Sequence, residues 1–205
     1  MSSENAGDTQ TWRLLANAAL MAGREFCYSL EIVSVTPVMK LLGLNDEATS
    51  LIWITSPILG LLIGPFIGSF SDRCTFKLGR RRPFIIFLCL FAMLGMTLLT
   101  FAPYMVDTLG SSALVIAIIG SQMMDWGLDA TETPFRAYTL DCIPKPDQTS
   151  AFNIQTLLTG LGGGFGFIMA GTFGIEKREE LYYVAIVFCL VSLVLTLTSF
   201  KGKWS

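Results

Sequence analysis

The amino-acid sequence predicts an all-α, polytopic membrane protein with six transmembrane helices. Hydrophobic residues make up 52% of the 205 residues and charged residues only 15%, which is too apolar a composition for a chain that covers its own core in water. Six apolar runs are each long enough to cross a bilayer, which takes about 20 helical residues. Basic residues gather in alternate connections between these runs, as they do in cytoplasmic loops.

The predicted spans follow one another with short polar connections. They cover residues 14–38, 51–70, 84–103, 112–138, 152–173 and 181–200. Residues 1–13 form a polar tail without the basic start and cleavage region of a secretory signal. Residues 201–205 form a second polar end.

The distribution of basic residues predicts how the spans are threaded. Nine basic residues fall in the tail, end and connections that we assign to the cytosol: Arg13, Arg73, Lys77, Arg80, Arg81, Arg82, Lys145, Lys201 and Lys203. Three fall in the outer connections: Lys40, Lys177 and Arg178. This bias predicts that both termini lie in the cytosol.

The first span carries charged residues on one helical face. Arg24, Tyr28 and Glu31 lie at positions i, i+4 and i+7, so their side chains project from the same side. A charge near the bilayer centre costs at least about 2.5–3.5 kcal/mol and normally faces a partner or a watery cavity. This face therefore indicates either a polar pathway or an ion pair that locks helices together.

The second and third spans carry less information about function. Gly60, Gly64 and Gly68 make a stripe of small residues on the second span, which predicts close contact with another helix. The third span is uniformly apolar, as expected for a scaffold or lipid-facing helix.

The fourth span concentrates ionisable residues on one face. Asp125, Asp129, Glu132 and Arg136 follow one another by four, three and four residues. Because a helix rises about 1.5 Å per residue, Asp125 lies near mid-membrane at a depth similar to that of Arg24. We predict that Arg24 pairs with Asp125 or Asp129.

The close spacing of three carboxyl groups on this face also predicts that one of them binds a proton. Like-charge repulsion and desolvation favour proton binding by one of the three carboxylates, Asp125, Asp129 or Glu132. A local salt bridge between Glu132 and Arg136 at the membrane edge is the alternative for Glu132.

The fifth span is rich in glycine. Its glycines are Gly160, Gly162, Gly163, Gly164, Gly166 and Gly171. They predict close backbone approach or local flexing. A phosphate-binding loop is excluded because no strand precedes them and no Lys-Ser or Lys-Thr follows.

Several classes of function are disfavoured. The chain has no His, so proton chemistry must use carboxylates and a His-based metal site is excluded. The five Cys lie in apolar runs or cytosolic loops, which argues against a disulfide framework. No nucleophile and base arrangement indicates an enzyme, and we expect no cofactor, no metal and no nucleic-acid partner.

The loop between the second and third spans carries the most specific motif. Gly68, Asp72 and Arg73 are followed by Gly79, Arg80, Arg81 and Arg82, then by Pro-Phe-Ile. A topological anchor is the simple interpretation. The pattern, however, resembles the signature loop of the major facilitator superfamily. Its spacing, the first-span segment from Gly23 to Tyr28, and Pro134 with Arg136 in the fourth span are similar to the sucrose-transporter branch. This branch includes plant sucrose carriers and animal proton-associated sugar and membrane-associated transporters.

The resemblance implies one half of a twelve-helix carrier, with substrate bound between two six-helix halves. It implies proton-coupled symport of a sucrose-like sugar at a site that includes Arg24, Glu31, Asp125, Asp129, Glu132 and Arg136. Arg136 is the candidate for contact with sugar hydroxyls, and the loop residues Gly68, Asp72, Arg73, Gly79, Arg80, Arg81 and Arg82 are candidates for a cytoplasmic gate latch.

The expected partners are sugar, protons, the lipid bilayer and either a missing C-terminal half or a second copy of the chain. The expected location is the plasma membrane or an intracellular vesicle membrane. The alternative function is a non-transporting six-helix membrane protein that binds and regulates a full-length relative.

Overall fold

A computed structural model describes residues 4–73, 80–174 and 177–200, and these residues form helices without any strand. The elements are α1 Glu4–Leu41, α2 Asp46–Arg73, α3 Arg82–Phe101, η1 Ala102–Met105, α4 Val106–Leu109, α5 Ser112–Cys142, η2 Lys145–Asp147, α6 Gln148–Phe173 and α7 Arg178–Ser199. The all-α prediction is confirmed for the part of the chain that is described.

Three helical segments are long and apolar enough to cross a membrane within the described residues. They are Arg82–Leu109, Lys145–Phe173 and Arg178–Ser199. The helices α1 and α5 are not among them, and both carry charged residues in mid-helix, which lower their hydropathy. In addition, α1 begins at Glu4, so it takes in most of the polar segment predicted as a tail.

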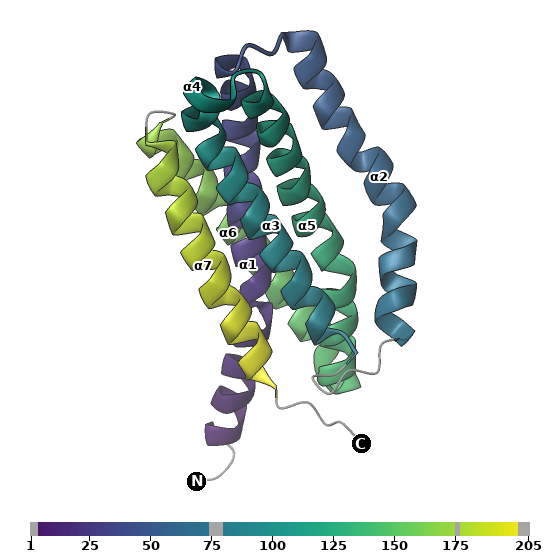
Figure 1. Cartoon of the computed structure of the whole chain (residues 1–205). Helices are drawn as coiled ribbons and strands as arrows, with labels where there is room; N and C mark the ends of the chain where they lie inside the picture. The colour runs from purple at the N-terminus through teal and green to yellow at the C-terminus, as the bar shows by residue number, and fades with distance from the viewer. Residues whose placement is uncertain (1–3, 74–79, 175–176, 201–205) are drawn as a thin grey trace.

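Helix α1 lies in the middle of the bundle (Figure 1), where it packs against α5, α6 and α7. Helix α3 packs against α5 and α7, while α2 stands at the edge beside α5. The beginning of α1 and the end of α7 lie at the same end of the bundle. The core contains Phe26 of α1, whose ring lies 5.1 Å from the ring of Phe188 on α7.

Glycines bring α1 and α6 into backbone contact. A Cβ atom added at Gly162 would overlap the carbonyl oxygen of Ala22, and one added at Gly166 would lie 2.8 Å from the carbonyl oxygen of Phe26. The close approach predicted for the glycine-rich span is therefore present at these two positions. A second such contact, for which the sequence of the uniformly apolar third span gives no signal, places Gly95 of α3 against Gly120 of α5.

Helix α2 is attached to the bundle near its start. The indole Nε1 of Trp53 donates a hydrogen bond to Thr36 Oγ1 at 3.1 Å, and Gln122 Nε2 donates to the Ile52 carbonyl oxygen at 3.3 Å. Further along, α2 diverges from the bundle (Figure 1). At Gly60 the predicted helix contact is not formed within the described residues, because an added Cβ there would have no neighbour within 4 Å.

Candidate functional site

Helices α1 and α5 face each other through a polar seam with a repeat of seven residues. The two helices run in opposite directions (Figure 1). Thr139 Oγ1 donates to Asn17 Oδ1 at 3.2 Å. One repeat further along α1 and one back along α5, Arg24 Nη1 donates to Glu132 Oε2 at 2.8 Å. Seven residues span almost two helical turns, so equal steps keep residues on the shared face.

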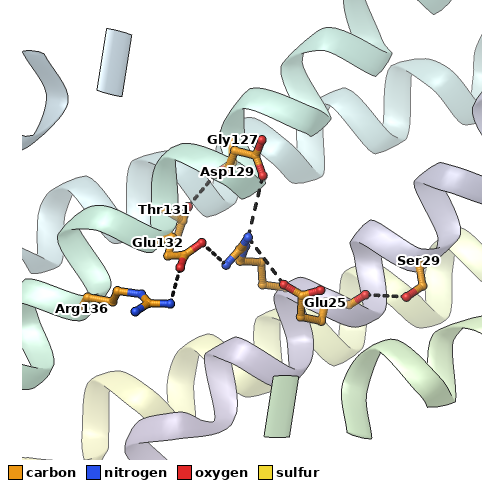
Figure 2. Close-up of polar contacts among 8 residues, drawn as sticks. Glu25, Ser29, Gly127, Asp129, Thr131, Glu132 and Arg136 are labelled. Atoms are coloured by element: carbon orange, nitrogen blue, oxygen red, sulfur yellow. Dashed lines mark hydrogen bonds and ion pairs between the residues drawn. The ribbon is translucent and has the colours of Figure 1, made fainter. Parts of the chain in front are cut away.

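Arg24 is the central cation of this seam. Its side chain is only 10% exposed, and besides Glu132 it lies 3.7 Å from Asp129 Oδ1 and 3.5 Å from Glu25 Oε1. Figure 2 shows Asp129 and Glu132 on α5 and Glu25 on α1 converging on this guanidinium. A largely buried arginine requires such compensation because an unpaired charge loses its hydration without replacement.

Glu132 connects Arg24 to a second guanidinium. One carboxylate oxygen contacts Arg24, and the other accepts from Arg136 Nη2 at 2.6 Å. The local salt bridge considered from the sequence is therefore present, but it is part of a chain of charges that crosses from α5 to α1. Arg136 is 57% exposed, so it is the solvent-accessible end of this row of charged side chains.

Glu31 and Asp125 are the next level of the same seam. Each lies seven residues beyond the Arg24–Glu132 pair, Glu31 along α1 and Asp125 back along α5. Both are buried, with 2% and 5% exposure. The negative charge of Asp125 acts on Glu31 through space, and one carboxyl oxygen of Glu31 has no hydrogen-bond partner among the described residues.

The sequence predicted Asp125 or Asp129 as the partner of Arg24. The structure places Asp129 at 3.7 Å from Arg24 and Glu132 closer, at 2.8 Å. Asp125 instead lies level with Glu31, because the register of α1 on α5 pairs Arg24 with residues one to two turns nearer the end of α5. Glu25 was not among the site residues predicted from the sequence, although its position next to Arg24 was the available signal.

The seam holds an excess of acid. Five carboxyl groups belong to it or contact its cation, namely those of Glu25, Glu31, Asp125, Asp129 and Glu132, against the two guanidinium groups of Arg24 and Arg136. Within the described residues, no group of His, Cys, Asp or Glu has an arrangement suited to hold a metal ion. The arrangement can bind protons, and its exposed Arg136 can donate hydrogen bonds to an acceptor.

The basic motif predicted as a gate is only partly described. Arg80 is exposed, and Arg81 Nε lies 3.3 Å from Asp141 Oδ2 at the end of α5. Gly79 lies outside the described residues. Gly68, Asp72 and Arg73 belong to α2, but their surroundings and side chains also lie outside the described part.

Arg82 joins three helices at this end of the bundle. From the start of α3 it donates to the Phe200 carbonyl oxygen, next to the end of α7, at 2.6 Å. It also donates to the Tyr138 hydroxyl of α5 at 3.2 Å, and its guanidinium lies 5.5 Å from the centre of that ring. Tyr138 was not expected at this junction, because no local pattern links it to the basic loop.

Comparison with known proteins finds relatives over most of the chain. A Solute carrier family 45 member 4 of Mus musculus is 37% identical over 211 residues, covering 95% of this chain and 26% of that protein. A Proton-associated sugar transporter A of Rattus norvegicus is 38% identical, covering 94% of this chain and 28% of the relative. A sucrose transport protein of Oryza sativa subsp. indica is 29% identical, covering 94% and 37%.

These matches confirm the resemblance to the sucrose-transporter branch. The chain spans well under half the length of each of these relatives. The family described as Major Facilitator Superfamily matches residues 12–203. With three helical segments able to cross a bilayer and this match over almost its whole length, the chain is a multi-pass membrane protein that belongs to the Major Facilitator Superfamily.

Proposed function

We propose that the chain forms the N-terminal six-helix half of a proton-coupled transporter of a sucrose-like sugar. The observation that carries this proposal is the buried charged seam between α1 and α5, where carboxyl groups outnumber guanidinium groups. Buried ionisable residues in membrane helices are costly and usually belong to a substrate or proton pathway. The names of the relatives, a proton-associated sugar transporter and a sucrose transport protein, support the substrate class.

Six helices are long enough for the proposed topology. They are α1, α2, α3, α5, α6 and α7, and the shortest has 20 residues, which is about the length of a bilayer crossing. Both ends of the chain lie on the cytosolic side in this proposal. Protons are the coupling ion, no cofactor takes part, and a sugar would contact Arg136 from the accessible end of the seam.

The test is sugar uptake driven by an imposed proton gradient. The chain is reconstituted into sealed vesicles alone, with the C-terminal half of a relative, and with a full-length relative. Uptake that depends on the gradient and is lost in Asp125→Asn supports the proposal, because removing a buried acid from the seam removes a proton-binding group. Uptake that is equal in Asp125→Asn and the unmodified chain contradicts it. An exposed acid gives the matched control, Glu47→Gln on the first turn of α2, which should leave uptake unchanged.

A second candidate is a protein that binds and regulates a full-length relative without transport. The observation in its favour is the exposed apolar side of α2, including Leu61 at 79% and Phe66 at 65% exposure. In the same experiment, such a protein alters the uptake of the relative and keeps this effect after Asp125→Asn.

A further inference from the structure

The α1–α5 seam has three levels, Asn17 with Thr139, Arg24 with Glu132, and Glu31 with Asp125. The third level differs from the other two in its chemistry. The first level joins an amide to a hydroxyl, and the second joins a guanidinium to a carboxylate. At the third level two acids, Glu31 and Asp125, occupy corresponding positions. Two neighbouring carboxyl groups in a buried site do not readily ionise together, because each negative charge raises the cost of the other.

Glu31 is the acid of this level whose negative charge would have no cation beside it among the described residues. It is 2% exposed, and its Oε2 atom has no hydrogen-bond partner among the described residues. The charged side chains that act on it electrostatically are Asp125 and Asp129 of α5. The charge of Glu31 in turn acts on Tyr182 of α7 and on Cys27 and Tyr28 of α1. None of these is a cation.

The two arginines near this level, Arg24 and Arg178, contact other side chains. Arg24 contacts Glu25, Asp129 and Glu132. Arg178 acts on Tyr182 and lies 5.8 Å from the centre of the Tyr104 ring. Helix α6, on another side of α1, contains no ionisable side chain. An isolated buried carboxylate would be strongly destabilising, whereas a neutral carboxylic acid avoids this penalty.

Two of the acids proposed from the sequence as proton carriers have a different environment. Asp129 and Glu132 each contact the Arg24 guanidinium, so each has a cation beside it. Their exposed fractions are 43% and 33%, so water also reaches them. A cation and water therefore lie beside Asp129 and Glu132, whereas Glu31 has neither among the described residues.

We propose that Glu31 holds a proton in this closed arrangement of α1 and α5 and is the residue that couples proton release to opening of the bundle. Opening admits water, the O–H bond of the Glu31 carboxyl breaks, the proton passes to water, and the carboxylate becomes hydrated. Closing the seam again requires a proton to return to Glu31. The coupling to sugar movement rests on the proposed transport function, but the location of the proton does not.

The proton is located by infrared difference spectroscopy of the full chain in lipid nanodiscs during a pH titration. We expect a carboxylic-acid C=O band at neutral pH that is absent in Glu31→Gln, a neutral substitution of the same shape. The band should remain in Asp125→Asn and in the control Glu47→Gln. A band that persists in Glu31→Gln, or one that is lost only in Asp125→Asn, overturns the proposal.

A second variant covers the case in which Glu31→Gln does not assemble. Glu31→Asp keeps the acid but shortens the side chain, so the band should move in frequency. A band at the same frequency in Glu31→Asp overturns the assignment. Size-exclusion chromatography and circular dichroism establish that each variant is folded before its spectrum is compared.

The coupling is measured separately in proteoliposomes. We expect Glu31→Gln to retain sugar exchange at equal pH but to lose the acceleration by an imposed proton gradient. Acceleration equal to that of the unmodified chain overturns the coupling role. If no sugar moves even when the chain is reconstituted with the C-terminal half of a relative, the proposed transport function fails, and the infrared result still decides whether Glu31 holds the proton.

Discussion

At the scale of single residues, Glu132 is the connection between the inside and the outside of the charged seam. Its two oxygens contact Arg24, which is 10% exposed, and Arg136, which is 57% exposed. The two contacts are unequal in energy, because exposed ion pairs contribute about 0–1 kcal/mol whereas hydrogen bonds to buried charged groups contribute about 1.5–3 kcal/mol.

This difference predicts the effects of two matched substitutions on stability. Glu132→Gln should lower the free energy of unfolding by about 1.5–3 kcal/mol because Arg24 loses its shortest ion pair. Arg136→Gln removes only the exposed contact and should cost under about 1 kcal/mol. Thermal or denaturant unfolding of the purified variants in detergent measures both. Equal losses would show that the contact with Arg24 contributes no more than the surface pair.

At the scale of secondary-structure elements, small residues determine how closely the helices approach. The backbones of α1 and α6 meet at Gly162 and Gly166, and those of α3 and α5 meet at Gly95 and Gly120. Between helices in a membrane the hydrophobic driving force is absent, so close approach stabilises their association through dispersion contacts. Other glycines of α6, such as Gly160, have no neighbour within 4 Å, so glycine content alone does not identify the contact face.

Two alanine substitutions in α6 test this contact. Gly162→Ala should destabilise the protein by about 1–3 kcal/mol, because its methyl group would overlap the backbone of Ala22. Gly160→Ala should be neutral or stabilising by up to about 1 kcal/mol, because alanine favours helix and the added group has open space. The measurement is again unfolding in detergent. A neutral Gly162→Ala would mean that α1 and α6 do not touch in this way.

At the scale of the whole molecule, the proposed topology places the connection after α3 outside and the connection after α5 in the cytosol. Asp107 in α4 and Lys145 in η2 are both exposed and lie in these two connections. The basic residues of the sequence favour this orientation because positively charged loops stay in the cytosol.

Labelling with a membrane-impermeant thiol reagent in sealed, outside-out vesicles measures the orientation. In a background without Cys74 and Cys142, Asp107→Cys should react directly, whereas Lys145→Cys should react only after permeabilisation. Reaction of both sites before permeabilisation would contradict a chain that crosses the membrane between them. Direct reaction of Lys145→Cys alone would reverse the orientation.

The sequence by itself determined the helical fold, the places where long helices occur, the family and the presence of charged faces on α1 and α5. These features depend on local composition and helical period, which neighbours along the chain define. The predicted helices and the charged face of Asp125, Asp129, Glu132 and Arg136 needed no knowledge of distant contacts.

Only the tertiary structure decided which charges meet. Pairing of Arg24 with Glu132, and the level of Glu31 with Asp125, depend on the register of α1 against α5. That register depends on tertiary packing between residues far apart in sequence, such as Asn17 and Thr139. A shift by one turn would move Arg24 to another acid while leaving every helical pattern unchanged, so helix periodicity alone carries no signal for the pairing.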